Sequence, residues 1–135
     1  MILSINTGSE QNSIALLGKD IAEEIFWKSY RTQSKELLPK IDRLLKLNKI
    51  KLTNLEAIAA FQGPGSYTGL RVGISVANAL GWGLDIPVMG IKNGQGEYNN
   101  LSALEIAKKA EKIIKVKKLY KFSKIVIPYY GSQLK

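Results

Sequence analysis

Residues 62–73 read Gln62-Gly63-Pro64-Gly65-Ser66-Tyr67-Thr68-Gly69-Leu70-Arg71-Val72-Gly73, a glycine-rich loop that runs directly into a helical pattern. Glycine permits positive φ and a close approach to the backbone, and Ser66 or Thr68 could cap the helix that follows. Because the N-terminus of a helix attracts anions, the loop is a candidate anion site. It is not a Walker loop, because no Gly-Lys-Ser/Thr follows at the required spacing. It is not a dinucleotide fingerprint either, because the last glycine of G-x-G-x-x-G is missing.

The helix predicted over residues 67–83 carries a stripe of small residues. Gly69, Gly73, Ala77 and Gly81 recur at every fourth position and therefore share one face. Each glycine inside a helix costs about 0.8–1 kcal/mol relative to alanine, so a close approach of another backbone must compensate for them. Two interpretations remain open: packing against the domain's own sheet or first helix, and docking against another subunit.

Hydrophobic periodicity predicts the rest of the first 91 residues. A meander of three antiparallel strands is followed by two helices that alternate with two buried strands, the order β-β-β-α-β-α-β. This order is typical of an α/β fold with a mixed five-stranded sheet and helices packed on it. Pro39 predicts a kinked or late start for the first helix. The expected strands are Met1–Asn6, Ser13–Leu17, Ile21–Ser29, Leu55–Phe61 and Val88–Ile91, and the first helix covers Leu37 to Leu47 with Thr32 or Ser34 as N-cap.

The last third of the chain has a different composition. Lys92–Asn100 is polar apart from Tyr98 and is interpreted as a linker, and Ser102 with Glu105 forms a capping box that starts another helix. A short strand is expected at Ile125–Ile127. Residues 92–135 hold ten lysines and three glutamates, a net charge of +7, and eight of the lysines lie in Lys108–Lys124. This cluster could attract the phosphates of a nucleic acid, or it could be a solvated helix face.

Composition excludes several classes of function. Cysteine and histidine are both absent, so we expect no disulfide, no thiolate or imidazole metal site and no Ser-His-Asp or Cys-His triad. No apolar run approaches the roughly 20 residues that span a bilayer. The N-terminus lacks the pattern of a signal peptide. We therefore expect a cytoplasmic protein with no membrane segment, no metal and no catalytic residue among these types.

The turn Asn6-Thr7-Gly8-Ser9 is a second candidate phosphate loop. Tight Gly/Ser/Thr turns present amides and hydroxyls that can hold a phosphate. Phosphoryl-transfer sites usually also need a carboxylate for Mg²⁺, and the neutral Asn6 is a poorer metal ligand. The alternative is a plain hairpin turn.

These motifs together resemble the TsaB (YeaZ) family, a bacterial subunit of the machinery that makes threonylcarbamoyladenosine at position 37 of tRNAs. The resemblance covers about residues 1–91 continuously. It rests on four stretches: Ile2–Thr7, similar to I-L-x-I-D-T; Leu37–Leu45, similar to L-L-P-x-I-x-x-L-L; Gly63–Gly73, similar to G-P-G-S-[FY]-T-G-[LV]-R-[IV]-G; and Leu84–Gly90. The first stretch departs from the family at one position, because the family has Asp where this chain has Asn6.

The resemblance implies an actin-like (ASKHA) lobe and a non-catalytic role. A TsaB protein binds the related catalytic subunit TsaD through the two helices of its first lobe and works beside the ATPase TsaE. Without its partner, the same small-residue stripe should support a homodimer, since an exposed packing face seeks cover. In this setting the Lys108–Lys124 cluster could contact the tRNA. No cofactor is implied. Docking of this kind predicts that Gly73→Leu or Ala77→Trp abolishes the heterodimer and leaves the monomer folded. The implied contact residues are Leu38, Ile41, Leu45, Gly69, Leu70, Gly73, Ala77, Leu80 and Gly81, beside the signature-loop residues Gly63, Pro64, Gly65, Ser66, Thr68 and Arg71.

The chain is much shorter than a two-lobed member of this family. We interpret residues 1–91 as the first lobe, 92–100 as a linker that replaces the second lobe, and 101–135 as a C-terminal helix and closing segment packed on the same lobe. The alternative function is a reduced ASKHA phosphotransferase or ATPase that uses Asn6–Ser9 and Gly63–Gly65.

Overall fold

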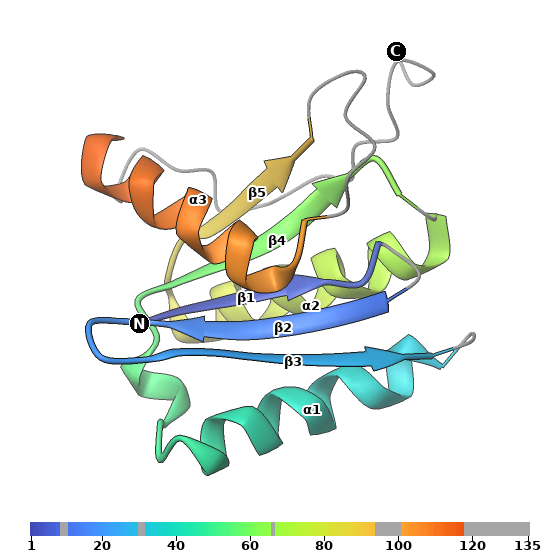
Figure 1. Ribbon diagram of the computed structural model, residues 1–135, viewed down its shortest axis with the longest axis horizontal. Helices are drawn as coiled ribbons and strands as arrows, with labels where there is room; N and C mark the ends of the chain where they lie inside the picture. The colour runs from blue at the N-terminus through green and yellow to red at the C-terminus, as the bar shows by residue number, and fades with distance from the viewer. Residues whose placement is uncertain (9–10, 30–31, 66, 94–100, 118–135) are drawn as a thin grey trace.

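A computed structural model describes residues 1–8, 11–29, 32–65, 67–93 and 101–117. Within these ranges a mixed five-stranded sheet carries three α-helices, which confirms the predicted α/β class and the order of its elements (Figure 1). The elements are β1 (Ile2–Asn6), β2 (Gln11–Leu17), β3 (Ala22–Lys28), α1 (Gln33–Leu47), a 3-10 turn (Leu52–Asn54), β4 (Ala57–Gly63), α2 (Tyr67–Leu84), β5 (Val88–Lys92) and α3 (Ala103–Lys117).

The strands follow the order β3-β2-β1-β4-β5 across the sheet. The first three form the predicted antiparallel meander, and Gly18 N donates to Ile21 O at 2.8 Å to close the turn between β2 and β3. β4 and β5 join β1 in parallel. Parallel neighbours need a crossover connection, which α1 provides before β4 and α2 provides before β5.

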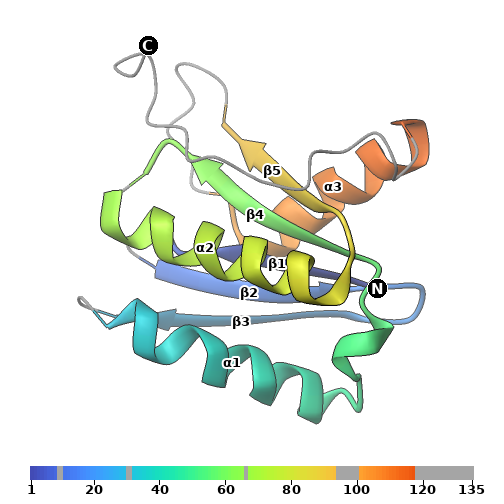
Figure 2. The ribbon, with the colours of Figure 1, turned by 180° about the vertical axis from the view of Figure 1, so that it is seen from behind.

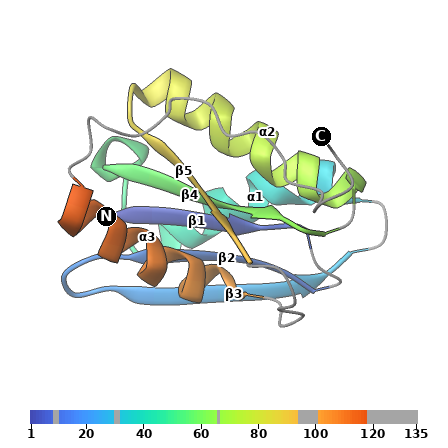
Figure 3. The same ribbon diagram turned by 90° about the horizontal axis from the view of Figure 1, so that it is seen from above.

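The helices form two layers, one on each side of the sheet. α1 and α2 cover one face, and α3 covers the opposite face (Figures 2 and 3). The alternation of β1 matches this arrangement, because Ile5 lies against α2 whereas Ser4 hydrogen-bonds to the first turn of α3. Apolar side chains of the sheet and of all three helices join in one buried core. Along the described ranges no helix is long and apolar enough to cross a membrane.

Helix α1 corrects one expectation. It begins at Gln33 with Thr32 as N-cap and continues through Pro39 to Leu47, so the predicted late start is wrong. Proline removes the hydrogen bond to the carbonyl of Lys35. Pro39 and Lys35 are both exposed, so water can hydrogen-bond to that carbonyl. The Thr32 hydroxyl bonds to the Glu36 carboxylate instead of capping the backbone.

The predicted start of α3 is confirmed. Ser102 N donates to Glu105 Oε1 at 3.1 Å, and Glu105 N donates to Ser102 Oγ at 3.2 Å, which is the reciprocal pattern of a capping box. The expected strand at Ile125–Ile127, the closing segment and most of the predicted linker lie outside the described residues.

Candidate functional site

The small-residue stripe of α2 faces the protein's own sheet. The Thr7 hydroxyl at the end of β1 donates to Gly69 O at 2.5 Å and accepts from Gly73 N at 2.9 Å. It therefore bridges two groups one helical turn apart, the pair that an i→i−4 bond would join. A Cβ atom at Gly73 would lie 2.4 Å from Thr7 Oγ1 and 3.1 Å from Ile5 Cγ2. The absence of a side chain is what lets β1 approach the helix.

At the C-terminal end of the stripe, a strand again lies close to a glycine of α2. A Cβ atom at Gly81 would lie 2.1 Å from Val88 Cγ2 in β5, and Ala77 is fully buried. Of the two interpretations of the stripe, the structure therefore supports packing against the domain's own sheet.

The predicted contact residues are corrected by this result. Most of the predicted contact residues are buried in the protein's own core, so a partner could not contact them. A Cβ atom at Gly73 would lie 2.4 Å from Thr7 Oγ1, so we now expect the leucine variant to be destabilised. Leu38 remains 52% exposed and Leu80 is partly buried. The buried members are Ile41, Leu45, Gly69, Leu70, Gly73, Ala77 and Gly81.

The opposite side of α2 is open and nearly uncharged. We call this side the outer face and define it by Thr68, Val72, Ser75, Ala79 and Trp82, which follow one another at helical spacing. Between Tyr67 and Leu84 the only charged residue is Arg71. Trp82 is 84% exposed, which is unusual for so large an apolar side chain.

A groove runs between the outer face and the start of α1. It has a volume of about 390 Å³ and is lined by Ser34 of α1 and by Thr68, Arg71, Val72, Ser75 and Val76 of α2. Leu38 lies one turn beyond Ser34 on the same side of α1. The groove and the outer face together make an apolar surface that both helices share.

Sequence reasoning missed Trp82 and the outer face. Periodicity showed which residues of α2 share a side, but it gave no sign of which side is buried. The available signal was the scarcity of charge: a surface helix of a globular protein normally carries charged residues on its solvent face, and α2 has a single one.

The Asn6–Ser9 turn uses its polar groups internally. Asn6 Oδ1 accepts from Gly8 N at 2.9 Å, and Asn6 Nδ2 donates to Leu101 O at 2.5 Å. The Thr7 hydroxyl is bonded to α2. Asn6 and Thr7 are both buried, and Ser9 lies outside the described residues. The side-chain donors of Asn6 and Thr7 and the amide of Gly8 are thus already engaged, which favours the plain-turn interpretation.

The signature loop lies against this turn. A Cβ atom at Gly65 would lie 2.3 Å from Gly8 O, and Gly63 has φ 122°, which strongly favours glycine. Gly63 O accepts from Asn93 N at 3.1 Å. Pro64 and Thr68 are exposed, Arg71 borders the groove, and Ser66 lies outside the described residues. The Asn6–Ser9 turn and the signature loop are therefore in backbone contact. The group that faces Gly65 is the carbonyl oxygen of Gly8 and not an amide.

Metal and anion sites find little support in the described part of the chain. No group of three or more His, Cys, Asp or Glu residues is placed to hold a metal ion there. At the start of α3, Leu104 N donates to Glu24 Oε2 at 2.6 Å and Ala103 N donates to Ser13 Oγ at 2.9 Å. A helix N-terminus that is satisfied by the protein's own carboxylate has little capacity left for a second anion.

Comparison with known proteins agrees with the architecture. A family model described as TsaD: tRNA N6-adenosine threonylcarbamoyltransferase matches residues 27–125. The chain is similar to the tRNA threonylcarbamoyladenosine biosynthesis protein TsaB of Haemophilus influenzae, with 39% identity over 92 residues, 68% of this chain and 39% of that protein. TsaB of Escherichia coli K12 is 34% identical over 109 residues, 78% of this chain and 47% of that protein. Among solved structures, YeaZ from Pseudomonas aeruginosa has a TM-score of 0.64 at 32% identity, covering 68% of this chain and 44% of that one.

The fold and its signature loop define a single lobe of the actin-like (ASKHA) class. The chain belongs to the TsaB (YeaZ) family, whose members share this lobe with the related TsaD proteins. It spans less than half the length of the TsaB proteins that it matches.

Proposed function

We propose that this chain is a non-catalytic subunit of the machinery that makes N6-threonylcarbamoyladenosine at position 37 of tRNA, and that it docks a TsaD-like catalytic subunit. Its family membership supports the pathway, because the relatives in H. influenzae and E. coli are described as tRNA threonylcarbamoyladenosine biosynthesis proteins. The match to the TsaD family model supports a pairing of two related lobes.

The observation that carries the docking proposal is the outer face of α2. Eighteen residues of this helix contain one charge, and the groove toward α1 adds further apolar surface. Depletion of charge with an aromatic anchor is typical of the centre of a protein interface. Trp82 and Leu38 supply such exposed apolar side chains. The docking surface is therefore proposed on the outer face and the groove, not on the buried stripe.

A non-catalytic role fits the described part of the Asn6–Ser9 turn. The side-chain donors of Asn6 and Thr7 and the amide of Gly8 each have a partner within the protein. A reduced phosphotransferase or ATPase would have to break these bonds before binding a nucleotide. Calorimetry with ATP and Mg²⁺ tests the alternative, and saturable heat at submillimolar nucleotide would revive it.

The proposal assigns all docking elements to residues 1–91. A linker at 92–100 in place of a second lobe is compatible with this assignment, because α1 and α2 precede it. A TsaE-like ATPase is proposed to join the complex through the TsaD-like subunit. Without that subunit, the outer face would be covered by a second copy of the chain.

The test is co-elution with the TsaD-like protein of the same organism. A double variant, Ser75→Glu with Ala79→Glu, places two charges on exposed positions of the outer face, and we expect affinity to fall at least 100-fold with unchanged thermal unfolding. Val116→Glu is a single-charge control, because Val116 is 80% exposed on α3 across the sheet, and each of Ser75→Glu and Ala79→Glu alone should lower the affinity more than it does. Undiminished co-elution of the double variant contradicts the docking surface. Light scattering of the unbound chain reports the homodimer.

A further inference from the structure

The exposed side of α3 is lined with lysines. Among the side chains described for Ala103–Val116, the exposed ones are Glu105, Lys108, Lys109, Lys112, Lys115 and Val116, so four of these six carry a positive charge. Because 3.6 residues complete a turn, they form one continuous stripe along about 10 Å of helix. We call these four lysines the α3 lysine stripe.

Most of this charge is not neutralised by the protein. Among the described residues, Lys108, Lys109 and Lys112 form no ion pair, and Lys115 Nζ lies 3.7 Å from Glu111 Oε1. The other nearby carboxylates serve the backbone of α3, since Glu105 accepts from Ser102 N and Glu24 accepts from Leu104 N. The stripe therefore presents its charge to solvent, where it is free to attract phosphate groups.

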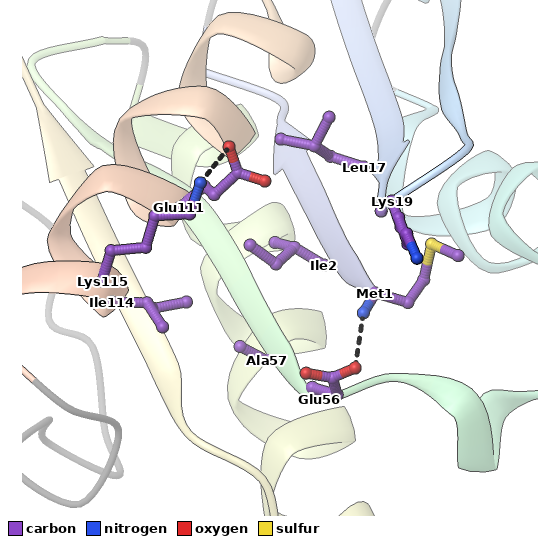
Figure 4. A pocket seen from close by; sticks show the side chains of 10 residues that line it. Met1, Ile2, Leu17, Lys19, Glu56, Ala57, Glu111, Ile114 and Lys115 are labelled. Atoms are coloured by element: carbon purple, nitrogen blue, oxygen red, sulfur yellow. Dashed lines mark hydrogen bonds and ion pairs between the residues drawn. The ribbon is translucent and has the colours of Figure 1, made fainter.

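The positive surface continues past the C-terminal half of α3. A pocket of about 310 Å³ separates this part of the helix from the turn between β2 and β3, with Lys115 on one side, Lys19 on the other and Ile2 between them (Figure 4). The amino group of Met1 also lines it and pairs with Glu56 at 3.0 Å. The carboxylates of Glu56 and Glu111 also line the pocket, where they pair with the Met1 amino group and with Lys115. Among the described residues Lys19 forms no ion pair, so it is the cation that adds net positive charge at this end of the sheet.

The location of the stripe restricts the kind of partner. The apolar side of α3 is buried against the sheet, and among the described residues of the helix Val116 is the one large apolar side chain that is exposed, which is too little to enter a lipid surface. The stripe lies across the sheet from the outer face of α2, so a protein docked there would leave it accessible (Figure 3). A polyanion whose charges repeat along its length matches a row of lysines, and a nucleic acid backbone is such a polyanion.

We propose that the α3 lysine stripe, extended by Lys19, binds the phosphate backbone of RNA. The choice of RNA rests on the proposed function in tRNA modification, whereas the phosphate chemistry rests on the lysines themselves. The contact is electrostatic and independent of base identity. This subunit then contributes to holding the tRNA while its opposite face binds the catalytic partner.

The test measures binding of the full chain to a fluorescein-labelled, unmodified tRNA transcript by anisotropy over a series of salt concentrations. The variant carries Lys108→Gln, Lys109→Gln, Lys112→Gln and Lys115→Gln. We expect its affinity to fall at least tenfold at about 0.1 M salt, and the slope of log K against log salt to flatten by about three, since each phosphate contact contributes 0.7–0.9.

The matched control removes the same charge from the other side of the sheet. It carries Lys35→Gln, Lys46→Gln, Lys49→Gln and Lys51→Gln, all at exposed positions of α1 or just after it. Its affinity should stay within about threefold of the unchanged protein, which supports the stripe as a site. An equal loss in both variants, an unchanged α3 variant, or no saturable binding by the unchanged chain would each overturn the proposal.

Two further measurements separate this proposal from its alternatives. Co-elution with the TsaD-like subunit should be equal for the α3 variant and the unchanged protein, so a failure of docking is seen independently of RNA binding. Vesicles of phosphatidylserine and phosphatidylcholine replace the tRNA in the lipid arm. Tighter binding to these vesicles than to tRNA would overturn the assignment to RNA.

Discussion

The two sides of α2 are built from similar residues but have opposite surroundings, because one side packs on the sheet and the other is exposed. The inner stripe of Gly69, Gly73, Ala77 and Gly81 lets strands β1 and β5 approach the helix backbone. The outer face of Thr68, Val72, Ser75, Ala79 and Trp82 is equally poor in charge, but the described part of the chain leaves it uncovered. Small residues on a helix therefore indicate a close contact without indicating the partner. The scarcity of charge on the remaining side carries the information about docking.

The largest effect is expected for a substitution in the inner stripe of α2. Gly73→Leu should destabilise the fold by on the order of 4 kcal/mol or more, because even a Cβ atom there would lie 2.4 Å from Thr7 Oγ1 and 3.1 Å from Ile5 Cγ2. Thr7 would also lose its bridge between Gly69 and Gly73. Urea unfolding followed by circular dichroism measures the change.

Gly83→Leu is the control for this variant, because a Cβ atom at Gly83 meets nothing within 4 Å. It should fold normally. A Gly73→Leu protein that unfolds at the same urea concentration as the unchanged chain would show that the stripe does not pack on β1 in solution.

The difference between the two sides of α2 also shows which features of the fold could be predicted from the sequence. Alternation and helical spacing were sufficient for the strands, the helices and the capping box of α3, because these depend on local patterns of apolar and polar residues. The orientation of α2 was not predictable in this way. It depends on a contact between Thr7 and Gly73, which are 66 positions apart, and no local pattern links a threonine at the end of one strand to a glycine in a later helix.

The same limit applies to the candidate site. Asn6 and Thr7 had the residue types of a phosphate loop, yet their donors bond to Leu101 and Gly69. Both partners are distant in sequence, so only the fold reveals that the turn is occupied. The start of α1 was misjudged for another reason: proline was treated as a helix breaker, although Pro39 lies on the solvent side, where water can replace the missing bond.

The next largest effect is expected for a substitution on the outer face of α2. Trp82→Ala should weaken binding to the TsaD-like subunit by about 2 kcal/mol, roughly 30-fold, since exposed tryptophans are frequent anchors of interfaces. Its side chain is 84% exposed, so the free energy of unfolding should change by less than about 0.5 kcal/mol. Titration calorimetry measures the affinity, and Val116→Ala on α3 is the control. A change in stability without a change in affinity would place Trp82 in the fold and not in the interface.

The smallest effects compare the buried and the exposed sides of α2 through the same substitution, glycine to alanine, at two positions that are two residues apart. Gly83→Ala should stabilise the protein by about 0.5 kcal/mol, because alanine has the higher helix propensity and a Cβ atom there has open space. Gly81→Ala should destabilise it by about 1–3 kcal/mol, because its Cβ atom would lie 2.1 Å from Val88 Cγ2. Thermal unfolding of both variants gives the two signs directly. Stabilisation by both substitutions would mean that helix propensity alone governs both positions. Opposite signs would mean that packing against β5 outweighs helix propensity at Gly81 and is absent at Gly83, so the boundary between the buried and the exposed sides of α2 falls between these two glycines.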